Sequence, residues 1–96
     1  MGILNRLFGP KADVQALIQE GAAVIDVRTP GEYRNGHYPG AKNIPLNTIQ
    51  QEVERLKKLN QPIVFCCASG ARSGQATRFL KSQGLEAHNA GSWRNL

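Results

Sequence analysis

The chain has 96 residues, of which 41% are hydrophobic and 20% charged, so it has the composition of one ordinary globular domain and is too short for two independent cores. Its net charge of +5 at pH 7 favours anionic ligands or an acidic partner, but the basic residues are not interleaved with aromatic ones, which argues against nucleic-acid binding. Cys66 and Cys67 are adjacent, and because neighbours in a strand point to opposite faces, they predict free thiols and neither a disulfide nor a zinc site.

Residues 1–12 predict a short amphipathic extension that ends at Gly9 and Pro10. They contain neither the apolar stretch nor the cleavage site of a signal peptide, and Arg6 stands where a myristoylation signal has Ser or Thr. We expect residues 1–8 to fray and not to bind a membrane, with contact to a membrane or a partner as the alternative interpretation. Together with the free thiols, this start of the chain favours the cytoplasm.

From residue 13 onward the chain alternates between helical and strand patterns. Helices are indicated by N-cap residues and by apolar positions three or four apart, and strands by short apolar, β-branched runs. The predicted helices cover residues 14–20 (with Asp13 as N-cap), 30–35, 48–59 and 73–83, and the predicted strands cover residues 22–27, 41–44, 62–66 and 86–89. This alternation, without a hairpin signal, predicts an α/β fold with a small parallel sheet flanked by helices on both sides.

Two of the predicted helices have signals that can be checked residue by residue. Thr29, Pro30 and Glu32 supply the N-cap, the first helical position and the acidic residue of a capping box. The helix that begins at Thr48 has one apolar face, which consists of Ile49, Val53, Leu56 and Leu59.

The segment after the third predicted strand has the features of an anion-binding or nucleophilic loop. It joins a buried strand to a helix N-terminus at the carboxyl end of the sheet, where α/β folds bind ligands. Gly70 permits the tight backbone that would turn several N–H groups toward the sulfur of Cys67. Arg72 adds a cation, and Ser73 is expected to cap the helix or to donate to a bound anion. The candidate site residues are Cys67 as the nucleophile and, for substrate binding, Ala68, Ser69, Gly70, Ala71, Arg72 and Ser73.

Four stretches, in order and correctly spaced, resemble the signatures of the rhodanese family. Residues 67–73 (CASGARS) resemble its Cys-x-x-Gly-x-Arg-Ser loop, and residues 26–33 (DVRTPGEY) resemble its Asp-Val-Arg-x-x-x-Glu-Tyr signature. Residues 36–41 (GHYPGA) are similar to its Gly-His-Ile-Pro-Gly-Ala, and residues 91–93 resemble a shortened form of its closing Gly-Gly…Trp segment. The resemblance spans residues 13–93.

This resemblance implies a rhodanese-like fold for residues 1–96, in which residues 1–12 are an extension, and a thiosulfate sulfurtransferase activity. A donor such as thiosulfate would leave a sulfane sulfur on Cys67 as a persulfide, and a thiol or protein acceptor in the cell, or cyanide in the assay, would remove it. No metal and no other cofactor is expected. Ala68 stands where members of the family often carry a basic residue, so Arg72 is the only cation of the loop.

Two other functions remain open. Phosphatases and arsenate reductases with related folds have one more residue in the loop than the four that separate Cys67 from Arg72 here, and the longer loop suits a tetrahedral oxyanion. Some rhodanese-like domains are inert binding or regulatory modules, but these commonly lack the cysteine.

Several polar residues of the resembling stretches are expected to serve structure and not chemistry. The resemblance implies that Asp26, Arg28 and Glu32 form hydrogen bonds with neighbouring loops. His37, next to glycine and proline, is expected to be a satisfied turn residue, and Trp93 is expected to pack over the rim of the site.

Overall fold

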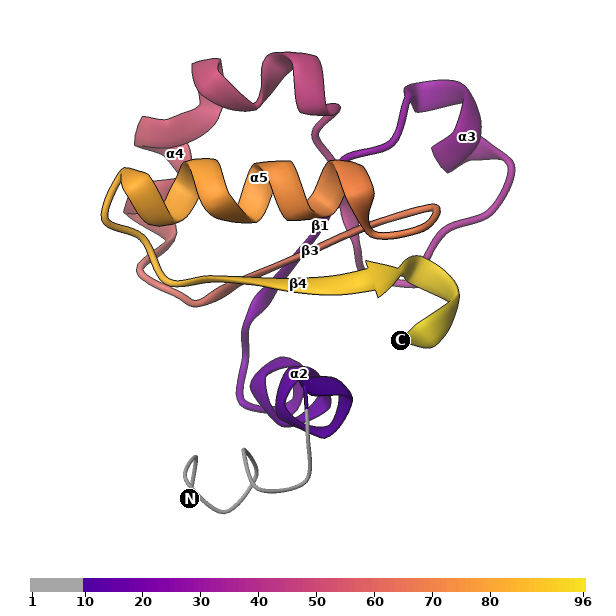
Figure 1. Ribbon diagram of the computed structural model, residues 1–96, viewed down its shortest axis with the longest axis horizontal. Coiled ribbons are helices and arrows are strands. Elements are labelled where there is room, and N and C mark those ends of the chain that lie inside the picture. Colours follow the sequence, from indigo (N-terminus) through magenta and orange to yellow (C-terminus); the bar gives the residue numbers. More distant parts are fainter. Residues whose placement is uncertain (1–9) are drawn as a thin grey trace.

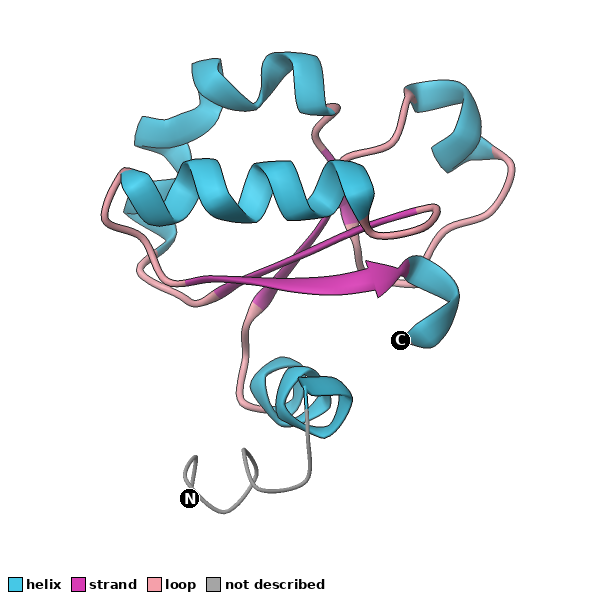
Figure 2. Cartoon of the chain, in the orientation of Figure 1, coloured by secondary structure: helices cyan, strands magenta, loops and turns pink. Residues whose placement is uncertain are grey.

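The computed structural model describes residues 10–96, with side chains from residue 13 onward. Its four strands form one parallel sheet in the order β2-β1-β3-β4: β1 (Ala23–Asp26), β2 (Lys42–Asn43), β3 (Ile63–Cys67) and β4 (Ala87–Ser92). The helices are α2 (Pro10–Gln19), α3 (Pro30–Arg34), α4 (Val53–Leu59), α5 (Ala71–Ser82) and the short 3₁₀ helices η1 (Leu46–Glu52) and η2 (Trp93–Asn95). Figures 1 and 2 show α4 and α5 on one face of the sheet and α2 on the other, so the predicted α/β fold is confirmed.

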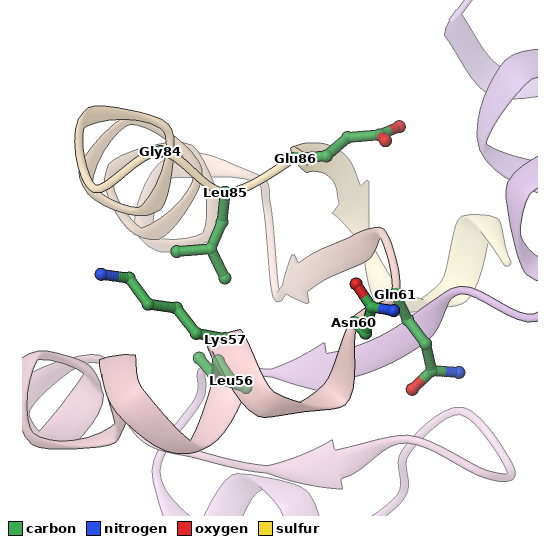
Figure 3. Close-up of a pocket in the computed structure, with 7 residues that line it drawn as sticks. All are labelled: Leu56, Lys57, Asn60, Gln61, Gly84, Leu85 and Glu86. Atoms are coloured by element: carbon green, nitrogen blue, oxygen red, sulfur yellow. The ribbon is translucent and has the colours of Figure 1, made fainter.

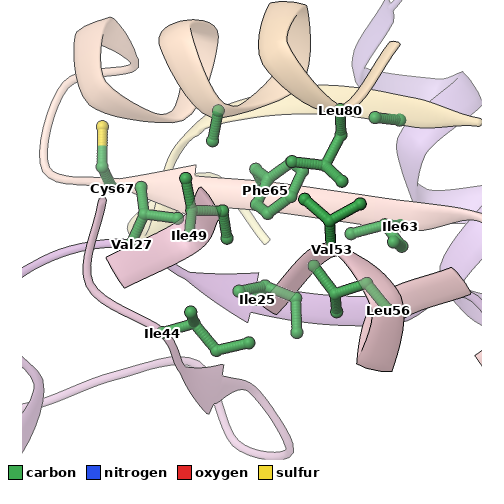
Figure 4. Packing of buried hydrophobic residues seen from close by; sticks show 12 residues of the cluster. Ile25, Val27, Ile44, Ile49, Val53, Leu56, Ile63, Phe65, Cys67 and Leu80 are labelled. Atoms are coloured by element: carbon green, nitrogen blue, oxygen red, sulfur yellow. The ribbon is translucent and has the colours of Figure 1, made fainter. Parts of the chain in front are cut away.

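The central strand β3 divides the core into two clusters. All five of its residues are buried, as expected for a parallel strand covered on both faces. Phe65 and Cys67 belong to the cluster on the side of α4 and α5, whereas Cys66 belongs to the smaller cluster on the side of α2. Figure 4 shows the first cluster, with Cys67 at the end where Val27 and Ile49 also lie. The adjacent thiols therefore face opposite sides of the sheet, as predicted.

The first helix begins earlier than predicted. α2 starts at Pro10, because proline suits the first helical position, where its missing N–H group is not needed. Asp13 therefore lies in the first turn and is not the N-cap. The rest of the predicted extension, residues 1–9, lies outside the described residues. No helix in the described part of the chain is long and apolar enough to cross a membrane.

The predicted helix over residues 48–59 begins two residues earlier, at Leu46, and consists of two helices of different pitch. Thr48 donates both its N–H and its hydroxyl to the carbonyl of Pro45, each at 2.9 Å, and this three-residue spacing favours the tighter 3₁₀ turn of η1. The buried positions of its apolar face are confirmed, but Leu59 is 37% exposed. Leu59 is the last residue of α4, and the chain leaves the helix at Asn60, whose φ is 55°.

The last two strands each begin one residue later than predicted and also end later. β3 includes Cys67, and β4 continues to Ser92. The pairing of these strands shifts register, since Phe65 pairs with Asn89 but Cys66 pairs with Gly91. The extra residue is a β-bulge, which short apolar patterns do not reveal.

The capping box at α3 is confirmed, and it generates a stability prediction. The Thr29 hydroxyl accepts the N–H of Glu32 at 3.2 Å, and a Glu32 carboxylate oxygen accepts the N–H of Thr29 at 3.0 Å. Thr29→Ala should lower the free energy of unfolding by about 1 kcal/mol, because it leaves an N–H group of the first turn without its side-chain acceptor. Denaturant unfolding measures this, and Thr29→Ser, which keeps the hydroxyl, is the control; equal midpoints for all three proteins would contradict the prediction.

Candidate active site

The sulfur of Cys67 lies beneath the turn that joins β3 to α5. Cys67 ends β3, and Gly70 precedes α5 with a φ of 108°, a conformation that favours glycine. A side chain at Gly70 would also place its Cβ only 3.2 Å from the Cα of Gly91. The turn brings the N–H of Gly70 to 3.0 Å and that of Ser73 to 3.4 Å from Cys67 Sγ. The loop thus directs backbone donors at the sulfur, as the sequence predicted.

The outer surface of the loop is exposed, whereas the sulfur beneath it is buried. Cys67 has no exposed surface, while Ala68, Ser69 and Ala71 are exposed. These three residues therefore form the outer surface of the loop at the carboxyl end of the sheet, where ligands bind in α/β folds.

Ser73 does not cap the helix. α5 begins at Ala71 with Gly70 as its N-cap, so Ser73 is the third helical residue, and its side chain is fully buried. The Ser73 hydroxyl lies 3.3 Å from Cys67 Sγ and donates to Asn89 Oδ1 at 2.6 Å. The prediction of an N-cap was wrong because the glycine turn starts the helix two residues earlier.

The charge of Arg72 is paired. Its guanidinium donates to both carboxylate oxygens of Glu32, at 2.7 and 3.0 Å. The hydrogen bond from Arg72, and then that from the Thr29 backbone, lowers the pKa of Glu32 to about 2. Since Glu32 also accepts the N–H of Thr29, its carboxylate connects the rim of the site with the capping box of α3. The sequence predicted Arg72 as the cation of the loop, but its pairing with a residue 40 positions away was not visible there.

The two thiols have opposite electrostatic environments. Burial raises the pKa of the Cys67 thiol, but hydrogen bonds from the Ser73 side chain and from the N–H groups of Ser73, Gly70 and Ser69 lower it by more, so its pKa lies below the ordinary value. Burial, and then the nearby charge of Asp26, raises the pKa of Cys66 to about 12. Cys67 is therefore the thiol that the structure favours as a thiolate, the nucleophilic form.

Asp26 and Arg28 form a buried ion pair at the carboxyl end of β1. Arg28 donates to both Asp26 carboxylate oxygens, at 3.0 Å from Nε and 2.8 Å from Nη2. It also donates to the Gly36 carbonyl at 2.7 Å, and its guanidinium lies 4.9 Å from the centre of the Trp93 ring. These contacts give the pair the structural role that was expected.

Trp93 and His37 also lie outside the sulfur's surroundings. Trp93 is partly buried and packs against the cluster of Cys66, on the opposite face from Cys67, so it does not cover the sulfur. His37 Nδ1 donates to the Tyr33 carbonyl at 2.8 Å, and its ring stacks on that of Tyr33. His37 is thus a satisfied turn residue, as predicted.

A cavity of about 510 Å³ opens beside the loop. It shares Arg72 with the loop and Val27 with the cluster of Cys67, and its lining residues are Val27, Thr29, Pro30, Pro45, Leu46, Asn47, Thr48 and Arg72. Another cavity, of about 340 Å³, is drawn in Figure 3 and is lined by residues of α4 and of the segments that precede β3 and β4. This second cavity lies at the amino ends of the strands, at the opposite end of the sheet from Cys67.

Asn89 is a residue near the sulfur that the sequence patterns did not indicate. Its side-chain amide donates to the Gly70 carbonyl at 3.1 Å and accepts the N–H of Gly91 at 2.9 Å and the hydroxyl of Ser73. The only signal for it in the sequence is an asparagine close to a glycine at the end of a predicted strand, which is a weak one.

Comparisons with known proteins agree with this architecture. Residues 11–94 match the rhodanese-like domain family. Thiosulfate sulfurtransferase GlpE of Pseudomonas fluorescens is 35% identical over 76 residues, which cover 79% of this chain and 69% of GlpE. The uncharacterized protein YqhL of Bacillus subtilis is 38% identical over 63 residues, 66% of this chain, and the match spans about half (49%) of YqhL. The solved structure of the human single-domain sulfurtransferase TSTD1 superposes with a TM-score of 0.71 at 31% identity, over 86% of this chain and 88% of the human one.

The contrast between the two thiols generates a pH prediction. In native protein, the thiolate of Cys67 should form below the ordinary thiol pKa of about 8.5, whereas Cys66 should stay protonated until the pH approaches 12. Because the pKa of Cys67 is lowered in the folded protein, its thiolate stabilises the fold at pH values above the ordinary thiol pKa, and this stabilisation is lost as the pH falls through the pKa of the folded state. Because the pKa of Cys66 is raised, its neutral thiol stabilises the fold at pH values below the ordinary thiol pKa, and this stabilisation is lost as the pH rises toward 12. Thiolate absorbance and alkylation with iodoacetamide, located by peptide mass, measure both. A midpoint for Cys67 at or above 8.5 would contradict the prediction.

Proposed function

Because this chain belongs to the rhodanese-like domain family, we propose that it is a thiosulfate sulfurtransferase that carries a sulfane sulfur on Cys67 as a persulfide. The observation that carries the proposal is the convergence of the Gly70 and Ser73 N–H groups on Cys67 Sγ, at 3.0 and 3.4 Å, with the Ser73 hydroxyl oxygen 3.3 Å from the same sulfur. Donors in this arrangement stabilise a thiolate before reaction and negative charge near the sulfur during it.

In the first step the Cys67 thiolate attacks the sulfane sulfur of thiosulfate. A bond forms between Sγ and that sulfur, the sulfur–sulfur bond of the donor breaks, and sulfite leaves with the electron pair. Cys67 then carries a persulfide whose outer sulfur holds the negative charge. We assign the binding of this group to the loop that consists of Ala68, Ser69, Gly70, Ala71, Arg72 and Ser73.

In the second step a thiolate acceptor attacks the outer sulfur. A new sulfur–sulfur bond forms on the acceptor, the bond to Sγ breaks, and Cys67 leaves as a thiolate with the electron pair. The lowered pKa of Cys67 makes it a better leaving group in this exchange. The cellular acceptor is a thiol or a protein, and cyanide serves as acceptor in the assay. Two free thiols fit a reducing compartment such as the cytoplasm.

The pairing of Arg72 bears on the choice of donor. Its cation is neutralised by Glu32 at the rim, and the neighbouring cavity has apolar walls formed by Val27, Pro45 and Leu46. A dianionic donor therefore meets backbone N–H groups and an ion pair, and the positive charge of Arg72 attracts it only weakly because Glu32 already pairs with that charge.

Cys67→Ser should reduce thiosulfate:cyanide transfer to the background rate, because serine cannot form a persulfide. Cys66→Ala should keep most of the activity per folded molecule, since Cys66 lies in the apolar cluster on the other face of the sheet and alanine preserves a small apolar side chain there. Steady-state rates, with circular dichroism to measure the folded fraction, test this pair. Equal losses in the two variants would indicate a joint role for both thiols and overturn the assignment.

Glu32→Gln should raise kcat/KM for thiosulfate by a few-fold and leave a neutral alkyl trisulfide donor unchanged. Glutamine can still accept the capping hydrogen bonds, but it removes the carboxylate that repels the dianion and occupies Arg72. Glu54→Gln is the matched control, because it makes the same charge change on α4 at a side chain that is 83% exposed. If Glu32→Gln changed kcat/KM equally for both donors, or if Glu54→Gln changed it as much as Glu32→Gln, the pairing of Arg72 with Glu32 would not govern the reaction with anionic donors.

A further inference from the structure

Cys67, Ser73 and Asn89 form a line of hydrogen-bonding groups that connects β3, α5 and β4. Sγ of Cys67 lies 3.3 Å from the Ser73 hydroxyl oxygen, which lies 2.6 Å from Asn89 Oδ1. Cys67 and Ser73 have no exposed surface, so bulk water does not replace either partner. The hydroxyl has a single proton, and it can therefore donate to Asn89 or to Cys67 but not to both at full strength.

The orientation of the Asn89 amide is fixed by two backbone groups. Its NH₂ donates to the Gly70 carbonyl, and its Oδ1 accepts the N–H of Gly91. The reversed amide would place NH₂ against that N–H and Oδ1 against that carbonyl, so the atom that faces Ser73 is the oxygen, which only accepts. In the observed arrangement Ser73 gives its proton to Asn89 and turns the lone pairs of its oxygen toward Cys67.

The β-bulge in β4 explains how Asn89 reaches the loop. The pairing with β3 passes from Asn89 to Gly91, and Ala90 is the extra residue. Bulges next to active sites redirect side chains in this way. The fit on the helix side is close, because a Cβ at Gly74 would lie 3.3 Å from the NH₂ of Asn89.

The two positions of the proton suit two states of the sulfur. A neutral thiol can donate to the Ser73 oxygen, which donates onward to Asn89, so the chain of hydrogen bonds is continuous. A thiolate only accepts, and it faces an oxygen lone pair unless the hydroxyl rotates toward it. We propose that Asn89 is a positioning residue that holds the Ser73 hydroxyl while Sγ is neutral, as thiol or persulfide, and releases it to Sγ when Cys67 becomes an anion. The persulfide state in this statement rests on the proposed sulfur transfer.

This proton switch would act twice in each catalytic cycle. The hydroxyl turns toward Asn89 when the thiolate becomes the uncharged inner sulfur of the persulfide. It turns back when the acceptor breaks the persulfide bond and the electron pair, with its negative charge, returns to Sγ. In this switch Asn89 acts through Ser73 and does not bond to the reacting sulfur.

Other ionisable groups around the site do not obscure a titration of Cys67. The pKa of Glu32 is about 2 and that of Cys66 about 12, so neither changes its charge in the range where a thiol near 8.5 titrates. The elements around Cys67 carry further charged and titratable side chains: Asp26 at the end of β1 and Arg28 just after it, Glu32, Tyr33 and Arg34 of α3, Glu52 of η1, Cys66 of β3, Arg72, Arg78 and Lys81 of α5, and His88 of β4.

A double-mutant cycle tests the switch. The thiolate of Cys67 is titrated by its absorbance in four proteins that all carry Cys66→Ala: one without further change, one with Ser73→Ala, one with Asn89→Ala, and one with both substitutions. Ser73→Ala should raise the pKa of Cys67, because the sulfur loses a donor. Asn89→Ala should lower it by about half a unit, since the hydroxyl then has the sulfur as its remaining acceptor, and should have no further effect when Ser73 is already alanine. An upward shift with Asn89→Ala, or equal shifts with and without Ser73, would overturn the proposal and leave Asn89 as a support of the loop.

Asn89→Asp provides a second test that does not depend on the folding of the alanine variant. Aspartate keeps the acceptors for Ser73 and Gly91 and binds the hydroxyl more strongly. It should raise the pKa of Cys67, and by more with Ser73 present than in the Ser73→Ala background. Equal shifts of the Cys67 pKa with and without the Ser73 hydroxyl would show that Asn89→Asp acts by charge repulsion alone, and this would contradict the switch. These titrations need no turnover, so a failure of the sulfurtransferase assay and a failure of the switch are separate results.

Discussion

The site depends on the sharp turn that β3 makes as it leaves the sheet. The strand ends at a buried residue, and the chain must fold back over that residue to begin α5. Gly70 makes this possible, since its φ of 108° and its close approach to Gly91 both disfavour a side chain. The same turn aims the N–H groups of Gly70 and Ser73 at Cys67 and projects Arg72 outward to Glu32. One backbone conformation thus sets both the environment of the sulfur and the charge at the rim.

The alternation of side chains along β3 gives two adjacent thiols opposite properties. Cys66 points into the cluster under α2, where burial and the nearby negative charge of Asp26 keep it protonated. Cys67 points toward the N-terminus of α5, where hydrogen bonds more than offset the effect of its burial. A shift of one residue in the strand register would exchange the two thiols. The pairing of β3 with both neighbouring strands is therefore part of what selects the reactive sulfur.

Features that depend on a few neighbouring residues could be predicted from the sequence. The capping box at Thr29, the buried central strand and the glycine loop over Cys67 are of this kind, because a turn of helix or a stretch of strand encodes its own pattern. The pairing of Arg72 with Glu32 and the contacts of Asn89 could not be predicted, since the first joins residues 40 positions apart and the second requires a β-bulge. The start of α5 was predicted two residues too late for a related reason: a serine near a helix start resembles an N-cap until a glycine before it is known to take that place.

The central claim is that Cys67 accepts a sulfur atom, and intact mass spectrometry tests it most directly. The native protein is incubated with thiosulfate, freed of excess donor and weighed, and fragmentation of the peptide that contains both thiols then locates the modification. The account predicts a mass increase of one sulfur atom on Cys67, which disappears when cyanide or a small thiol is added. An unchanged mass with thiosulfate and with a persulfide donor, or an added sulfur on Cys66, would contradict it.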